Sequence, residues 1–108
     1  FKRFTIIGMK QCVYCGVYAQ CAYCGFYGPM TKEHVVPHCY GGRVKILACA
    51  NCNQQRGHSG KDPRFLKWLE THEDIFRKAV RESADPVRTD TWLQSEGLDQ
   101  YRLAVLNS

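Results

Sequence analysis

The pattern of apolar and polar residues predicts short strands in the first half of the chain. A weak strand pattern covers Phe4–Ile7. β-Branched residues between Lys32 and Pro37 are typical of a second short strand. The apolar run Val44–Ala48 is long enough for a third strand, and the turn-like segment 39–42 lies between the last two. These two segments therefore predict a β-hairpin.

The second half of the chain carries helix signals instead. The polar segment 51–57 favours a short helix that ends at Gly57. Asp62-Pro63 combines an N-cap residue with proline at the first helical position, and apolar residues then recur at helical spacing as far as Ala84. A second helical stretch is expected over roughly 89–106, with a break near Gly97. Strands followed by helices predict an α+β fold.

The 108 residues allow one domain, which we divide into a core over residues 1–61 and a helical segment over 62–108 packed on it. The chain has seven cysteines, and six of them form Cys-x-x-Cys pairs. A secreted disulfide scaffold is one explanation. Paired cysteines with a long segment between the pairs are more typical of a zinc site in a reducing compartment, so we expect a cytoplasmic protein. No apolar run reaches membrane-spanning length.

Four cysteines are expected to bind a structural Zn²⁺ ion, because two knuckles complete a tetrahedral thiolate site: Cys21, Cys24, Cys49 and Cys52. Such an ion adds folding free energy that a small core lacks. Cys12 and Cys15 could compete for the same ion, hold a second ion with Cys39 or a histidine, or remain free thiols. We prefer the later pair, and interpret Cys39 as a buried residue or loop thiol.

The net charge of +5 is distributed unevenly. Residues 1–61 carry eight lysines and arginines against one glutamate, whereas residues 62–108 carry seven against nine acidic residues. The cysteine-rich half is therefore strongly positive and would attract a polyanion. This distribution indicates nucleic acid as the partner.

The segment between the knuckles holds a second set of polar residues. It contains Glu33-His34 followed by Pro37 and the Gly41-Gly42 pair, and Asn53 comes directly after the last cysteine. With its flanking knuckles, this segment resembles the zinc-bound subset of the HNH (ββα-metal, or His-Me finger) endonucleases. The resemblance covers roughly the first 60 residues. It implies a zinc-stapled ββα-metal core that hydrolyses phosphodiester bonds, with DNA as the favoured substrate.

The resemblance implies a role for each matching residue. His34 would be the general base that activates water, since a neutral imidazole suits this task at neutral pH. Glu33 and Asn53 would bind one catalytic Mg²⁺ or Mn²⁺ ion, and Arg56, one helical turn after Asn53, could face the same phosphate. The candidate phosphate contacts outside the motif are Lys32, Arg43, Lys45 and His58.

Two features depart from the family pattern. The middle asparagine of the family falls near Val44, where no amide is present. Neighbours in a strand also point to opposite faces, so we expect a twist or bulge to bring Glu33 and His34 to one site. The rival interpretations are a catalytically inactive zinc-dependent nucleic-acid-binding module and a RING-type interaction domain. The sequence leaves a homodimer open and assigns no role to His38.

Overall fold

The computed structural model describes residues 16–106 of the chain. Within this range, a three-stranded antiparallel sheet and five α-helices confirm the α+β class. The predicted strand Phe4–Ile7 lies outside the described residues, as do Cys12 and Cys15.

The sheet has the order β1-β2-β3 and is built around one long strand. The first half of β2 (Tyr27–His34) pairs with β1 (Val17–Gln20), and its second half pairs with β3 (Lys45–Ala48). The predicted hairpin is therefore present, although its first strand begins five residues earlier than Lys32 and ends at His34. Along β2 and β3 the partners advance by one residue at each step, so this ladder contains no bulge.

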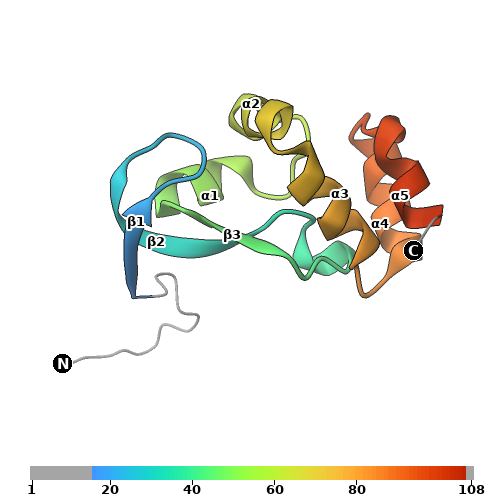
Figure 1. Cartoon of the computed structure of the whole chain (residues 1–108), viewed down its shortest axis with the longest axis horizontal. Helices are drawn as coiled ribbons and strands as arrows, with labels where there is room; N and C mark the ends of the chain where they lie inside the picture. Colours follow the sequence, from blue (N-terminus) through green and yellow to red (C-terminus); the bar gives the residue numbers. More distant parts are fainter. Residues whose placement is uncertain (1–15, 107–108) are drawn as a thin grey trace.

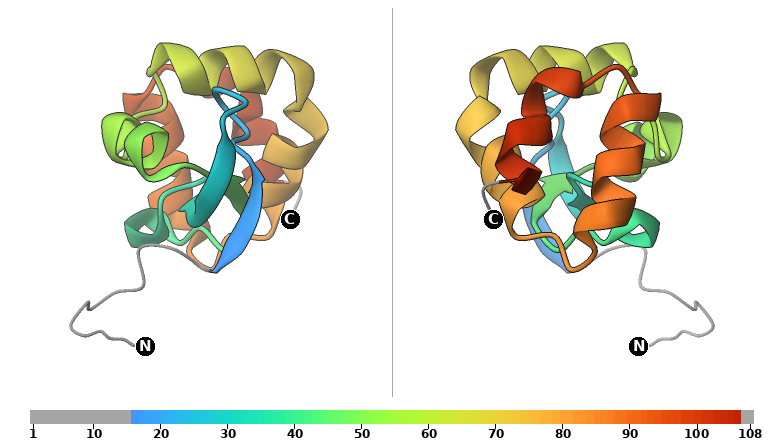
Figure 2. Two further views of the ribbon diagram at one scale, coloured as in Figure 1. Left: turned by 90° about the vertical axis from the view of Figure 1, so that its left-hand side faces the viewer. Right: turned by 90° about the vertical axis from the view of Figure 1, so that its right-hand side faces the viewer.

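The helices lie beside the sheet and beyond one of its ends. Figure 1 shows α1 beside the strands, α2 across the top, and α3 to α5 at the end that contains the C-terminus. Seen from the sheet end, α1 and α3 lie on opposite sides of the strands, and α4 and α5 pack together behind them (Figure 2). The helices are α1 (Ala50–Arg56), α2 (Pro63–Thr71), α3 (Glu73–Arg81), α4 (Pro86–Ser95) and α5 (Arg102–Leu106), with 3₁₀ helices η1 (His38–Tyr40) and η2 (Asp99–Tyr101).

The prediction of one helix over residues 62–84 is wrong, because the chain breaks at His72 into α2 and α3. In a continuous helix, the His72 N–H would bond to the Trp68 carbonyl. Two side-chain atoms are within hydrogen-bond distance of that carbonyl oxygen instead: Thr71 Oγ1 at 3.2 Å and His72 Nδ1 at 2.9 Å. The His72 N–H therefore donates to the Leu69 carbonyl, which tightens the last turn of α2 and ends it.

The second predicted helical stretch is present, but it begins earlier than expected. The Asp85 side chain accepts a hydrogen bond from the Arg88 N–H, and Pro86 occupies the first turn, so α4 starts before Thr89. Its end matches the predicted break, since Gly97 has a φ of 75° that ordinary residues rarely adopt. None of the helices in residues 16–106 is both long and apolar enough to cross a membrane.

Two buried clusters stabilise the molecule. The smaller one is made by Met30, Ala48 and three of the four predicted zinc ligands, all in or beside the sheet. Tyr23 packs against both clusters and so connects them. The larger one joins the residues after β2 to the C-terminal helices and consists of Val35, Val36, Phe65, Trp68, Leu69, Phe76, Ala79, Val80, Trp92, Leu93, Leu98 and Tyr101.

Candidate functional site

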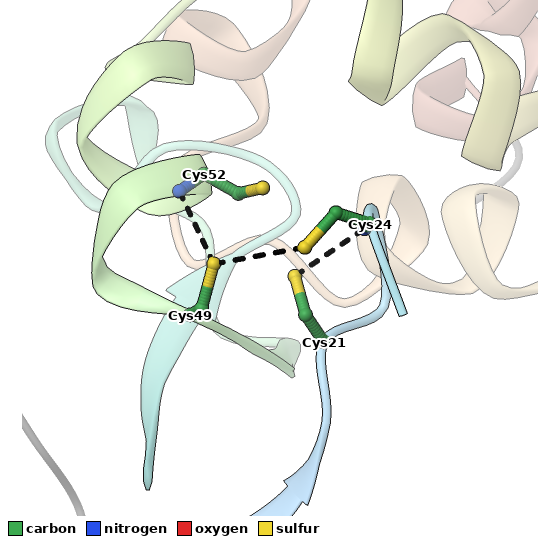
Figure 3. A group of neighbouring side chains, drawn as sticks. All are labelled: Cys21, Cys24, Cys49 and Cys52. Carbon is green, nitrogen blue, oxygen red and sulfur yellow. Dashed lines mark hydrogen bonds between the residues drawn. The ribbon is translucent and has the colours of Figure 1, made fainter. Parts of the chain in front are cut away.

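The four predicted zinc ligands lie together where the sheet meets α1. Cys21 and Cys24 come from the loop between β1 and β2, Cys49 is the N-cap of α1, and Cys52 lies in its first turn. Their sulfur atoms are all within 4.8 Å of one another, and Figure 3 shows them facing a common centre. This geometry suits a closed tetrahedral thiolate site, so the group could hold a metal ion such as zinc.

The loops around these cysteines direct N–H groups at the sulfur atoms. Tyr23 and Cys24 N–H lie 3.4 and 3.5 Å from Cys21 Sγ, and Cys52 N–H lies 3.5 Å from Cys49 Sγ. Burial opposes ionisation of Cys21, but the N–H groups that point at its sulfur outweigh burial and lower its pKa to about 7. At least one thiolate is thus favoured near neutral pH.

Cys52 behaves in the opposite way. Burial and its three thiol neighbours raise its pKa, because the neighbouring sulfur atoms disfavour a second negative charge. Four thiolates can coexist here only with a cation among them. The cluster therefore fits a structural zinc ion, held by thiolates from two segments that are far apart in sequence.

A separate open pocket lies at the end of β2, around His34. It has a volume of about 360 Å³ and is rich in cationic and imidazole groups. The ring of His38, from η1, contacts the His34 ring edge-on at a centroid distance of 5.2 Å. The residues that line it are His34, His38, Gly41, Gly42, Arg43, Lys45 and Ala84.

The environment of His34 keeps its imidazole neutral. Partial burial lowers its pKa, and the positive charges of His38 and Lys45 lower it further. A neutral imidazole has a free ring nitrogen that accepts a proton, and His34 therefore has the protonation state that a general base requires.

The Gly41-Gly42 pair shapes the wall of this pocket. A Cβ atom on Gly42 would lie 1.7 Å from the Val36 carbonyl oxygen, so only glycine fits there. Gly41 has a φ of 95°, and its carbonyl accepts a hydrogen bond of 2.7 Å from the Ala84 N–H. The turn thereby attaches the pocket to the segment that leads into α4.

Glu33 does not share the His34 pocket. The expected bulge is absent from the β2–β3 ladder, so the two neighbouring side chains point to opposite faces. Glu33 is only 3% exposed, and its Oε2 accepts hydrogen bonds from Tyr23 Oη at 2.7 Å and Arg56 at 2.8 Å. The expectation that a bulge brings Glu33 beside His34 is thus wrong, because Glu33 faces the protein core.

Arg56 is also buried, and this contradicts its predicted contact with phosphate. Its side chain is fully shielded from solvent. Besides the ion pair with Glu33, its guanidinium donates to the carbonyls of His34, Val35 and Ser59 at 3.1, 2.8 and 2.7 Å. The planar group also stacks over the Phe65 ring at 3.9 Å. Arg56 therefore fixes the backbone behind His34 from inside the protein.

Asn53 is anchored to the strand beside α1. Its Nδ2 donates to Thr31 Oγ1 at 2.7 Å and to the Lys32 carbonyl at 3.3 Å, so the amide ties α1 to β2. The structure thus places Asn53 against the strand that carries Glu33 and His34, at Thr31. The Lys32 side chain is exposed on β2.

The other predicted contacts are divided between two places. Arg43 and Lys45 are exposed and line the His34 pocket, as a phosphate contact requires. His58 is exposed after α1, where its Nδ1 lies 3.6 Å from the sulfur of Cys39. Cys39 is exposed on η1, so of the two interpretations of this residue the loop thiol is correct.

One residue that lines the pocket was missed by the sequence pattern, and one residue beside the pocket departs from the family pattern. His38 received no role, although its position four residues after His34 and directly after Pro37 is a signal that could have identified it. Val44 stands where the family has asparagine. Its carbonyl accepts a 3.0 Å hydrogen bond from the Val35 N–H and its side chain packs on the larger core cluster, so the loop is held without an amide side chain.

Comparison of the chain with protein-family models, with curated proteins and with solved structures gave no match.

Proposed function

We propose that this protein binds nucleic acid and hydrolyses a phosphodiester bond in the pocket around His34, with DNA as the substrate that the motif favours. The observation that carries the proposal is a neutral imidazole beside Arg43 and Lys45 in an open pocket. β2, β3 and α1 also follow one another in the order of a ββα unit. Both features agree with the resemblance to HNH endonucleases.

The electrostatics of the pocket favour a phosphate group. Arg43 and Lys45 supply two positive charges at its rim. Glu33, the only acidic residue among residues 1–61, is neutralised by Arg56 inside the protein. A phosphodiester would therefore meet the positive charges of Arg43 and Lys45 without opposition from Glu33.

His34 would activate the attacking water. Its imidazole accepts a proton from the water as the oxygen attacks phosphorus, and the P–O3′ bond breaks. Arg43 and Lys45 would stabilise the charge that develops on the phosphoryl oxygens. The products would carry 5′-phosphate and 3′-hydroxyl ends.

The two metals implied by the motif differ in how well the residues fit them. Cys21, Cys24, Cys49 and Cys52 fit zinc, which when bound would stabilise the fold and supply no catalytic chemistry. The pair Glu33 and Asn53 does not fit a catalytic Mg²⁺ or Mn²⁺ ion next to His34. The Glu33 carboxylate is held by Arg56 and Tyr23 on the opposite face of β2, away from the His34 imidazole.

A second candidate function is nucleic-acid binding without cleavage. It is favoured by the same burial of Glu33, because the carboxylate that the motif assigns to the metal contributes to the core instead. In that case Arg43 and Lys45 would still contact phosphate, and His34 would only contribute to binding.

Cleavage assays separate the two functions. Zinc-loaded protein would be incubated with plasmid DNA, single-stranded DNA and RNA, with Mg²⁺, with Mn²⁺ and with neither, beside His34→Ala. We expect cleavage by the wild type and at least a roughly 100-fold slower reaction by His34→Ala with unchanged nucleic-acid affinity. Binding without cleavage by the wild type would support the second function, and equal cutting by the variant would exclude His34 as the base.

Charge variants test the binding pocket itself. Lys45→Ala should weaken DNA affinity and reduce its dependence on salt concentration, because one phosphate contact is lost. Lys67→Ala is the matched control, since Lys67 is exposed on α2 and does not line the pocket. Similar affinity losses in both variants would show that only the overall charge of the protein matters.

A further inference from the structure

The His34 pocket contains a second imidazole whose position gives it a use in the same reaction. His38 is the first residue of η1 and is exposed to solvent. The backbone around it is well held: Pro37 is buried, and its carbonyl accepts hydrogen bonds from the Tyr40 and Gly42 N–H groups. With its ring centroid 5.2 Å from that of His34, His38 lines the same pocket, so one bound phosphodiester can meet both imidazoles.

Cleavage of a P–O bond needs two proton transfers. The attacking water must lose a proton, and the leaving O3′ must gain one or have its charge neutralised. Glu33, the residue that would bring a cation to the leaving oxygen, is locked against Arg56 on the other face of β2. Within the described part of the chain, the pocket offers Arg43, Lys45 and His38 as proton-bearing groups, and of these only an imidazole exchanges protons readily near neutral pH.

The pocket gives the two histidines different surroundings. Two imidazolium rings in edge contact repel each other, so a state with one charged and one neutral ring is favoured. His34 is the more buried of the two, and burial together with the charges of His38 and Lys45 lowers its pKa, so His34 is the histidine suited to accept a proton. Pairs with separated protonation states are the usual arrangement of an acid and a base in one site.

Charged residues from β3, from the turn before it and from the start of α4 lie around the two histidines. Lys45 from β3 and Arg43 from the preceding turn are both cationic. At the start of α4, Asp85 pairs with Arg88 at 3.5 Å, and Arg88 donates to the carbonyl of Cys39, next to His38. Asp85, which follows the pocket residue Ala84, is therefore engaged by an arginine of α4.

We propose that His38 is a second catalytic residue, the general acid of phosphodiester hydrolysis, and this inference rests on the proposed function. Water oxygen attacks phosphorus and gives a proton to His34, while the P–O3′ bond breaks and the leaving oxygen takes a proton from the His38 imidazolium. The two histidines then exchange their protons with solvent, which restores the starting state. No oxidant, reductant or co-reactant besides water is consumed.

Substrates with different leaving groups test this role. An oligothymidylate has an alkoxide leaving group that needs a proton, whereas thymidine 5′-(p-nitrophenyl phosphate) releases a stable phenolate that does not. We expect His38→Ala and His38→Gln to lower kcat/KM on the oligonucleotide by roughly 100- to 10,000-fold, and on the activated ester by less than about tenfold. His34→Ala should lower kcat/KM on both substrates.

The pH profile gives a second measurement on the same proteins. The wild-type rate should fall at low pH as His34 becomes protonated and at high pH as His38 loses its proton. His38→Gln should lose only the alkaline decline, which a purely structural role would leave in place. Because His38 is exposed, circular dichroism should confirm that both variants fold.

The outcomes distinguish this inference from the function on which it rests. Equal losses on both substrates, or no loss in the His38 variants, would overturn the acid role while leaving His34 as the base. Inactivity of the wild type toward both substrates would overturn the proposed hydrolysis, and the role of His38 with it.

Discussion

The buried Arg56–Glu33 pair makes a quantitative prediction about stability. Arg56→Met keeps much of the side-chain length but removes the positive charge and every hydrogen bond of the guanidinium. Glu33, at 3% exposure, would then be a buried carboxylate without its cationic partner, and the carbonyls of His34 and Val35 would lose a donor. Removing one partner of a buried pair costs about 3–5 kcal/mol.

This loss is large compared with the total stability of a small domain, which is about 5–15 kcal/mol. Equilibrium unfolding in urea measures it, with Trp68 and Trp92 as buried fluorescent reporters and with zinc buffered throughout. Zinc content should be measured on the same samples, so that lost metal is not mistaken for lost ion pairing. A change in unfolding free energy below about 1 kcal/mol, with zinc retained, would refute the reasoning.

Two further variants isolate the cause. Arg77→Met removes an arginine whose 3.4 Å ion pair with Glu73 is exposed, so we expect a change within about 0.5 kcal/mol. The double variant Arg56→Met, Glu33→Leu should be more stable than Arg56→Met alone, because no unpaired charge is left in the core. If the double variant is the less stable one, packing or backbone hydrogen bonds dominate at this position.

Three other predictions concern the metal cluster, the glycine turn and His34. Cys49→Ser should release zinc and abolish cooperative unfolding, whereas the exposed Cys39→Ser should do neither. Metal analysis measures the zinc content and thermal denaturation the cooperativity; zinc retained by Cys49→Ser would assign the ion to other ligands. Gly42→Ala should destabilise the fold by about 1–3 kcal/mol in urea unfolding, since its Cβ would overlap the Val36 carbonyl, and wild-type stability would contradict this. The folded protein lowers the pKa of His34 below 6.5, so the unfolded chain binds more protons and the free energy of unfolding should fall as the pH decreases below 6.5. His34→Ala should weaken this dependence on pH, and an unchanged dependence would contradict the assignment.

Local sequence signals anticipated much of the fold. Asp62-Pro63 starts a helix as predicted, because the Asp62 carboxylate accepts hydrogen bonds from the N–H groups of Arg64 and Phe65. The four paired cysteines come together as expected, since a two-residue gap suits a turn that directs two thiols at one ion. Such features depend on residues that are close in sequence, and they can be predicted without the rest of the fold.

The break at His72 could not be predicted from the spacing of apolar residues. Phe65, Leu69 and Phe76 continue the helical spacing across it, and no glycine or proline interrupts the pattern. The chain breaks because Thr71 and His72 side chains occupy the carbonyl that the helix would use. Periodicity detects which residues are buried, but it does not detect this competition for one acceptor.

Local sequence patterns were sufficient to predict the class of the fold, the cysteine cluster and the position of His34 in a strand that precedes a glycine turn. Which polar residues share a site with His34 depends on long-range packing, and local patterns do not predict it. Strand alternation separates Glu33 from it, and Arg56 turns inward to meet Glu33 and Phe65. The side of β2 that becomes buried is set by α1, which packs on it from beyond β3 and brings Arg56 to Glu33. The neighbour of His34 in the pocket is therefore His38, from η1, where the motif predicts Glu33.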